Sequence, residues 1–223
     1  MSALSKVRRL GLSIRKESSG VAMTEFALIM PFFLTFGLWG IELANFQFQT
    51  MKIEQLAANV ADNASRIGDY STLQNRKIYE SDIDDLLVGA NLAAGKSMDL
   101  FNRGRIIVSS LQVNSAGKQY IHWQRCVGTK SVASSYGKQG DVLGDAGIGP
   151  TGREVPATAS DAVIFVELQY DYDPLIAASF VGSTTIQSIA SYTVRSSRDL
   201  TQVYQTSPAS PVMTCGKFTN SVA

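Results

Sequence analysis

An almost unbroken apolar run near the N-terminus is the strongest hydrophobic pattern in the chain. Eighteen residues lie between Phe26 and Leu43, and the only strongly polar one is Glu42, at the far end. At about 1.5 Å per residue, a helix of that length spans roughly 27 Å, close to the hydrocarbon thickness of a bilayer. The run therefore predicts a membrane-spanning helix, placed at residues 21–46, with a buried core helix of a soluble protein as the alternative.

The pattern changes beyond the apolar run but remains helical. From Ala44 to Ile67, apolar residues recur mostly at steps of three and four, and no Gly or Pro interrupts before Gly68. That spacing gives a helix one apolar face and one polar face. Residues 47–68 are therefore expected to continue the helix out of the membrane and to pack on a soluble domain.

Residues 69–223 predict that domain, built from helices and an antiparallel sheet. A helix start is expected with Ser81 as its cap. Two β-prone segments surround an Asn-Ser-Ala-Gly turn within residues 105–125, and two alternating segments follow at 161–172 and 184–200. The expected fold class is α+β, with one long N-terminal helix and a small sheet of about four antiparallel strands.

The distribution of charge predicts how the chain sits in the membrane. Five basic residues and one acid give residues 1–20 a net charge of +4, although the whole chain carries only +1. The positive-inside rule places this basic leader in the cytoplasm and the domain on the other side of the bilayer. Because the leader lacks interleaved aromatic residues, we expect membrane lipid as its partner and no nucleic acid.

Few residues in the domain carry an obvious chemistry. Cys126 and Cys215 lie outside the cytoplasm in this topology, so one disulfide is expected, with free thiols as the alternative. His122 is the only histidine and is interpreted as a residue on a strand face. Without a metal-spaced cluster or a nucleophile motif, no catalytic residue, metal site, cofactor or enzyme activity is expected.

Two further motifs have a structural interpretation and a functional one. The letters from Gly147 to Gly152 fit G-x-G-x-x-G, but no apolar strand precedes them, so we expect an irregular loop between Val127 and Ser160 rather than a dinucleotide site. The acids Asp82, Asp84 and Asp85 suggest calcium, yet the spacing of a calcium loop is absent. Stabilisation of a helix N-terminus is the preferred role for these acids.

Glu25 is the residue that a simple membrane anchor does not explain. An acid inside a spanning segment costs about 2.5 to 3.5 kcal/mol on insertion scales and usually has a partner. The alternative is an acid that reaches outward to the interface. Gly37, Gly40 and Ala44 put small side chains where a second helix could approach closely, which favours helix association.

The residues around Gly20 carry a family resemblance. A basic leader that ends at Gly20, then an apolar helix with Glu25 as its fifth residue and Phe26 next, resembles a type IV prepilin processing site. More narrowly, GVAMTEFALIMPFF is similar to the start of TadE-like proteins, which are pilin-like (pseudopilin) components of the Tad (Flp) pilus system. The resemblance implies cleavage by a prepilin peptidase between Gly20 and Val21. It also implies that Glu25 pairs with the new amine of a neighbouring subunit and sets the register.

The same resemblance implies a location, partners and a function. The protein would cross the bacterial inner membrane once, with its leader in the cytoplasm and its C-terminal domain in the periplasm, or be incorporated into the extracellular pilus. Its partners would be the prepilin peptidase, other pilin-like subunits and the Tad pilus assembly machinery. It would act in assembly, or as a minor pilus component in adhesion and surface attachment. The alternative is a single-pass, membrane-anchored periplasmic binding module unrelated to pili.

Overall fold

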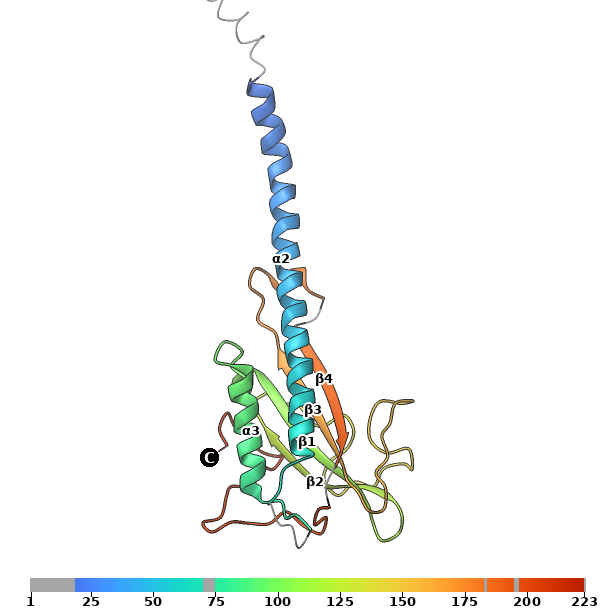
Figure 1. Ribbon diagram of the computed structural model, residues 1–223. Coiled ribbons are helices and arrows are strands. Elements are labelled where there is room, and N and C mark those ends of the chain that lie inside the picture. The colour runs from blue at the N-terminus through green and yellow to red at the C-terminus, as the bar shows by residue number, and fades with distance from the viewer. Residues whose placement is uncertain (1–18, 70–74, 183, 195–196, 223) are drawn as a thin grey trace, which may run out of the picture.

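The computed structural model describes residues 19–69, 75–182, 184–194 and 197–222, so most of the predicted leader lies outside the described residues. A long helix projects from a small domain of short helices and one sheet (Figure 1). The fold is α+β, as predicted. In chain order the elements are α2 (Ser19–Ala64), α3 (Glu80–Ala94), α4 (Leu100–Arg103), β1 (Gly104–Val113), β2 (Gln119–Val127), β3 (Val163–Asp171), η1 (Ala178–Phe180) and β4 (Thr185–Thr193).

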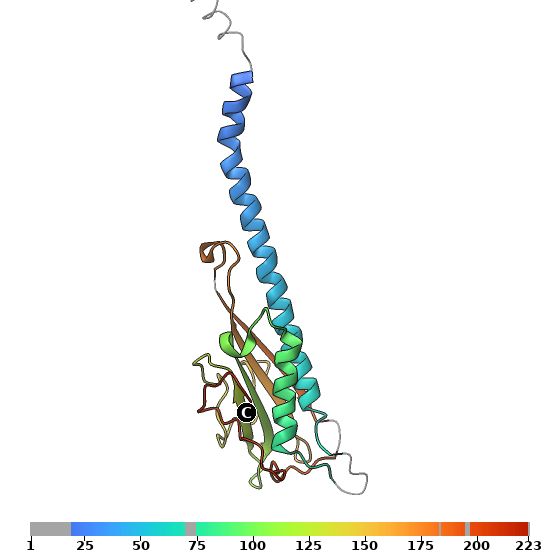
Figure 2. The same cartoon turned by 90° about the vertical axis from the view of Figure 1, so that its left-hand side faces the viewer.

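The two halves of the 46-residue helix α2 have different surroundings. Its N-terminal half extends free of the domain, whereas its C-terminal half lies on the sheet beside α3 (Figure 2). The change follows the sequence pattern, because the apolar residues of the C-terminal half are confined to one face and can be buried there. The buried positions on that face are Ile53, Leu56, Ala57, Val60, Ala61 and Ala64.

Helix α2 ends at Ala64, four residues before the break expected at Gly68. The buried Arg198 side chain lies at this end and donates hydrogen bonds to the carbonyls of Ala64, Ser65 and Ile67, at 3.2, 2.9 and 2.6 Å. A cation there complements the negative end of the helix dipole and satisfies carbonyls that have no partner within the helix. Burial lowers the pKa of Arg198 to about 10, so the side chain remains charged at neutral pH.

Helix α3 begins one residue before the cap expected for it, so the prediction for Ser81 was wrong. The N-cap is Tyr79, and the Asp82 carboxylate accepts a 2.9 Å hydrogen bond from the Tyr79 backbone N–H. Ser81 therefore lies inside the first turn. An acid at the third helical position can reach back to the cap in this way, and it determines the start here.

The four strands form one antiparallel sheet in the order β2-β1-β3-β4. The predicted turn between β1 and β2 is present, with hydrogen bonds between Asn114 and Lys118 and from Gly117 to Asn114. The outer edge of β2 is hydrogen-bonded to the loop after it and to the C-terminal tail, for example from Ile121 to Asp141. In the described parts of the chain, no strand pairs with the outer edge of β4.

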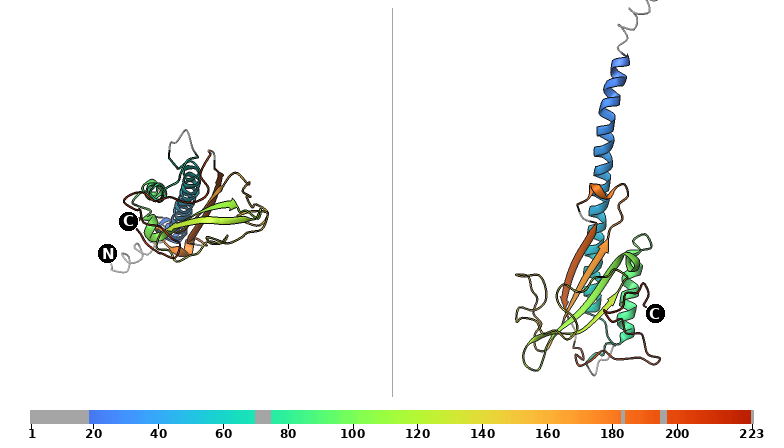
Figure 3. Two further views of the ribbon diagram at one scale, coloured as in Figure 1. Left: turned by 90° about the horizontal axis from the view of Figure 1, so that it is seen from below. Right: turned by 180° about the vertical axis from the view of Figure 1, so that it is seen from behind.

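Both faces of the sheet are covered, which the alternating pattern alone did not predict. Seen from below, α2 and α3 lie on one side of the sheet (Figure 3). That side holds the larger core, in which Ile164, Val166 and Leu168 of β3 take part. The alternate residues Val163 and Phe165 join a second, smaller core, covered by residues of the loop between β2 and β3.

Candidate functional site

The free half of α2 exposes an unusual amount of apolar surface. In the described part of the chain, α2 is the one helix long and apolar enough to cross a membrane, and none of its most apolar stretch is buried in the domain. A soluble monomer seldom exposes so large an apolar patch, so this surface requires lipid or another protein. The exposed large side chains here are Val21, Met23, Phe26, Leu28, Ile29, Met30, Phe32, Phe33, Leu34, Phe36, Leu38, Trp39 and Ile41.

The length of this exposed stretch matches a bilayer. Residues 20–41 in a helix span about 33 Å, against a hydrocarbon thickness of about 30 Å. Glu42, the next residue, is fully buried within the domain. The stretch that a membrane could cover therefore ends where the domain begins.

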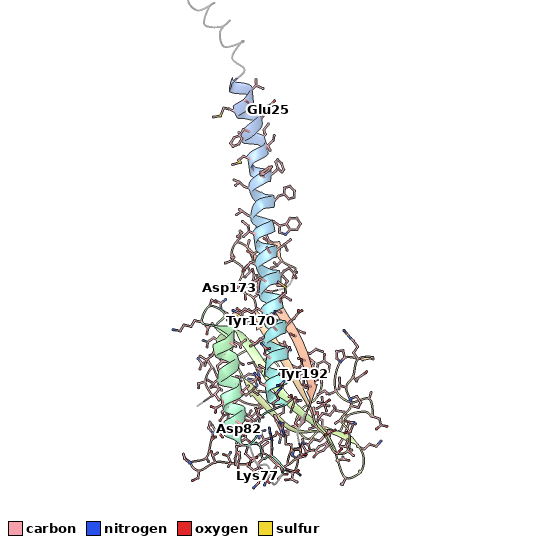
Figure 4. The ribbon with its side chains drawn as sticks, viewed as in Figure 1. Glu25, Lys77, Asp82, Tyr170, Asp173 and Tyr192 are labelled. Carbon is pink, nitrogen blue, oxygen red and sulfur yellow. A yellow bond between two sulfur atoms is a disulfide. The ribbon has the colours of Figure 1, made fainter. Side chains whose placement is uncertain are left out.

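Glu25 lies near the free end of α2, far from the sheet (Figure 4), and Phe26 is the next residue of the helix. Both are exposed, and among the described residues no hydrogen-bond or ion-pair partner is recorded for Glu25. Within the described residues, nothing neutralises the carboxylate among its apolar neighbours. A partner for Glu25 would have to come from outside the described residues.

Gly20 and Val21 are also remote from the domain. They lie in the first turn of α2, and a side chain built at Gly20 would meet no atom within 4 Å. The first backbone N–H groups of a helix have no partner within it, and helix ends fray. The Gly20–Val21 peptide bond is thus exposed near the N-terminal end of the described part of the chain.

The small residues predicted to pack against another helix face away from the domain. A side chain built at Gly37 or Gly40 would meet nothing within 4 Å, and Ala44 is exposed. At 100° per residue the three positions fall on one side of the helix. The structure therefore leaves this small-residue face open, and its role in helix association remains a prediction.

Glu42 fastens α2 to a loop that is distant in sequence. Its carboxylate accepts hydrogen bonds from the Tyr172 hydroxyl at 2.5 Å and from the backbone N–H groups of Leu175 and Ile176 at 3.3 and 2.6 Å. Burial and the bond to Glu42 raise the pKa of Tyr172 to about 12, so this hydroxyl remains a donor at neutral pH. The sequence showed Glu42 only as a polar residue at the end of an apolar run.

Three more contacts strengthen this junction between helix and loop. The Trp39 indole N–H donates to the Phe180 carbonyl at 3.0 Å, and the Asn45 amide donates to the Tyr172 hydroxyl at 2.6 Å. The rings of Phe46 and Tyr172 meet edge to face at 5.1 Å. The loop after β3 contains η1, and these contacts hold the loop against α2 near Trp39 and Glu42.

A buried pair of opposite charges joins α3 to the sheet. The Arg125 guanidinium on β2 makes two hydrogen bonds to the Glu80 carboxylate, one of them at 2.8 Å, and both side chains are less than 10% exposed. Nearby Asp84 is also buried, and its Oδ1 has no hydrogen-bond partner among the described residues. Burial, Glu80 and Asp85 raise the pKa of Asp84 to about 6, against the influence of Arg125.

Of the three acids considered for calcium, Asp82 is hydrogen-bonded within the fold, Asp84 is buried and Asp85 is exposed. Asp82 caps α3, and Asp84 is packed beside Glu80 and Arg125. In the described residues, no group of three or more His, Cys, Asp or Glu side chains could hold a metal ion.

The predicted disulfide is present between Cys126 and Cys215, with Cα atoms 4.8 Å apart. It joins the end of β2 to the C-terminal tail. The buried Arg105 guanidinium reinforces this attachment by donating to the carbonyls of Gly128, Cys215 and Lys217, and it stacks on the Phe218 ring.

The loop between β2 and β3 is irregular, as predicted, but fixed to the sheet. The buried Glu167 carboxylate accepts hydrogen bonds from the Ser134 hydroxyl and the Ser135 N–H. The G-x-G-x-x-G stretch forms a turn in which Ile148 and Val155 exchange backbone hydrogen bonds. His122 lies on β2 with its Nδ1 2.7 Å from the Tyr120 hydroxyl, as expected of a strand-face residue.

Comparison with known proteins finds a similarity that is confined to α2 and the residues just after it. The family model described as TadE-like protein matches residues 20–66, which covers α2 from its second residue to just beyond its end. No curated protein and no solved structure matches the chain. The matched segment contains the residues that carried the resemblance, from Gly20 to Phe26. Along this helix the chain is therefore similar to TadE-like proteins.

Proposed function

We propose that this chain is a pilin-like protein of a Tad/Flp-type pilus. It is anchored in the bacterial inner membrane by α2, with the leader in the cytoplasm and the C-terminal domain in the periplasm. It acts in pilus assembly or as a minor pilus component in surface attachment. The observation that carries the proposal is a TadE-like segment that begins at Gly20, on a helix whose first half is free of the domain.

In this proposal the leader is removed by a prepilin peptidase between Gly20 and Val21. A peptide bond must leave the helix before it enters a protease cleft, and the first turn of a helix is the easiest to unwind. Glycine at this position adds no side chain and tolerates dihedral angles that other residues resist. Cleavage would create an amine on Val21, which carries a positive charge at the membrane surface.

Glu25 supplies the acceptor for such an amine in a neighbouring subunit. An intermolecular pair would break no hydrogen bond or ion pair between Glu25 and the described residues. A charge pair in a low-dielectric environment adds little net stability but can fix the register between helices. The open face formed by Gly37, Gly40 and Ala44 allows those helices to approach closely.

A structural role of this kind requires no catalytic residue. The chemistry of the proposal is cleavage of the chain by another protein, followed by association of helices. The alternative function, a membrane-anchored binding module unrelated to pili, would use α2 only as an anchor and would keep residues 1–20.

The length of the mature chain separates these two functions. N-terminal sequencing of the membrane form from cells that make the pilus should give a chain that begins at Val21. The variant Gly20→Leu should retain the leader. Gly37→Leu is the matched control, since both glycines have open space around them, and it should be processed normally. A chain that keeps Met1 when all pilus components are present contradicts the proposal and supports the plain anchor.

The role of Glu25 is tested in the same cells. Glu25→Gln should still insert in the membrane but should be lost from the sheared pilus fraction. Glu54→Gln changes an exposed acid on the domain half of the same helix and should be incorporated normally. Equal incorporation of both variants would contradict the register role.

A further inference from the structure

The loop after β3 is the part of the domain that reaches furthest along α2 toward its N-terminus (Figure 1). We call residues 172–182 the apical loop. Hydrogen bonds to Glu42 and Trp39 hold it beside the last turns of the exposed apolar stretch. If α2 spans a bilayer, the same contacts place the apical loop at the outer surface of that bilayer.

The composition of the apical loop suits the boundary between lipid headgroups and acyl chains. Residues 174–182, with the sequence PLIAASFVG, contain no charged side chain. Leu175 is 67% exposed, and Ile176 is exposed beside it. The loop therefore presents branched apolar side chains to the surroundings although its backbone is anchored, which is unfavourable in water.

The acids at the base of the apical loop form ion pairs with basic residues of the domain, and the Asp173 side chain is itself exposed. Asp173 forms an ion pair with Arg103 at 2.7 Å, and Asp171 forms one with Lys130. The buried Glu42 carboxylate accepts hydrogen bonds from the backbone N–H groups of Leu175 and Ile176. The backbone donors of these two residues are therefore satisfied while their side chains remain exposed. A polar backbone group at a membrane surface must be satisfied before it can leave water.

We propose that the apical loop is a second membrane contact, which inserts Leu175 and Ile176 into the outer headgroup region next to α2. The occupant of this surface is lipid because the loop is continuous with the apolar surface of the spanning stretch and is held level with its end. Together, helix and loop fix the tilt of the domain on the membrane, since two contacts limit rotations that one helix permits. This inference depends on the proposed anchoring by α2.

Spin-label depth measurements on the full chain in phosphatidylcholine and phosphatidylglycerol vesicles test it. Nitroxide labels are attached to single cysteines introduced as Leu175→Cys, Phe33→Cys and Leu92→Cys, with the native disulfide left oxidised. Leu92 is the matched control, a leucine 75% exposed on α3, and Phe33 is 75% exposed in the middle of the free half of α2. All three sites are exposed, so labelling should leave the fold intact.

The label at position 175 should lie roughly 5–10 Å into the headgroup and acyl boundary, as amphipathic surface segments do. It should be shielded from a water-soluble nickel chelate and accessible to oxygen. The label at position 33 should lie deeper, and the label at position 92 should be fully accessible to the chelate.

Each other outcome has a distinct meaning. If position 33 lies in lipid but position 175 is as accessible to the chelate as position 92, the inference is wrong and the anchor stands. If position 175 is shielded from both the chelate and oxygen, a protein partner covers the loop, and the inference is also wrong. If position 33 is accessible to the chelate, both the anchor and the inference are overturned.

Discussion

The buried pair of Glu80 and Arg125 allows a quantitative prediction about the domain. Glu80→Gln removes one charge and leaves the guanidinium of Arg125 buried with its neutral acceptors, the Gln124 carbonyl at 3.0 Å and Gln139 Oε1 at 3.3 Å. Breaking a buried pair in this way costs about 3–5 kcal/mol, because the remaining charge is not compensated. That is a large share of a typical free energy of unfolding of about 5–15 kcal/mol.

Asp84 determines where in the range of about 3–5 kcal/mol the loss of stability in Glu80→Gln should fall. Glu80 is one of the groups that raise the pKa of Asp84 to about 6. Without the charge of Glu80, the Asp84 carboxylate ionises more readily and can partly replace it beside Arg125. We therefore expect about 3 kcal/mol at neutral pH, the lower end of the range for a broken buried pair, and a larger loss at a pH where Asp84 is protonated.

Urea unfolding of the full chain in mild detergent measures the effect. Trp123, buried on β2 two residues before Arg125, provides the fluorescence signal. The double variant Glu80→Gln/Arg125→Met should recover at least half of the loss, because an apolar side chain leaves no buried charge. Asp145→Asn in the exposed pair with Lys118 is the control, and it should change stability by no more than about 0.5 kcal/mol. A loss below about 1 kcal/mol for Glu80→Gln, or no recovery in the double variant, would refute the reasoning.

Two further predictions concern the domain. Asp84→Asn should raise the free energy of unfolding at neutral pH. The folded state raises the pKa of Asp84 from 3.8 to about 6, so the wild type should lose stability as the pH rises through that interval. The variant has no carboxyl group at this position and should not show this loss. Urea titrations across the interval test this, and parallel curves for the two proteins would contradict it. Replacing Cys126 and Cys215 by Ser removes a bridge with a sequence separation of 89, for which chain entropy gives at most about 4.6 kcal/mol. Because Arg105 still holds the C-terminal tail, denaturant unfolding should show a loss of stability smaller than this value. A larger loss would show that the disulfide also orders the folded state.

The sequence predicted what depends on periodicity and on local turn chemistry. The apolar run, the three- and four-residue spacing after it and the alternating strands gave the long helix, the hairpin and the antiparallel sheet. The resemblance at Gly20 and Glu25 agrees with the TadE-like match. These features can be predicted because each is encoded within a few neighbouring residues.

Contacts between distant residues could not be predicted in the same way. Glu42 accepts hydrogen bonds from Leu175 and Ile176, which lie more than 130 positions later in the sequence. Arg198 likewise caps a helix that ends at Ala64. Both side chains are charged and buried, whereas a hydropathy pattern assigns every charged residue to the surface. A charged residue at the boundary of an apolar segment was the one available signal, and nothing in the sequence identified its partner.

The difference between the two edges of the sheet has a consequence for self-association. Open strand edges are sites where proteins aggregate by adding strands, and antiparallel addition is the common form. Strand β4 carries no charged residue and lies lengthwise beside α2 (Figures 1 and 3). Antiparallel pairing of two β4 edges would reverse one chain relative to the other and point the two α2 helices in opposite directions. Two chains inserted in one membrane with the same orientation could not meet in that way, so the proposed anchoring by α2 would protect the sheet from adding strands at this edge.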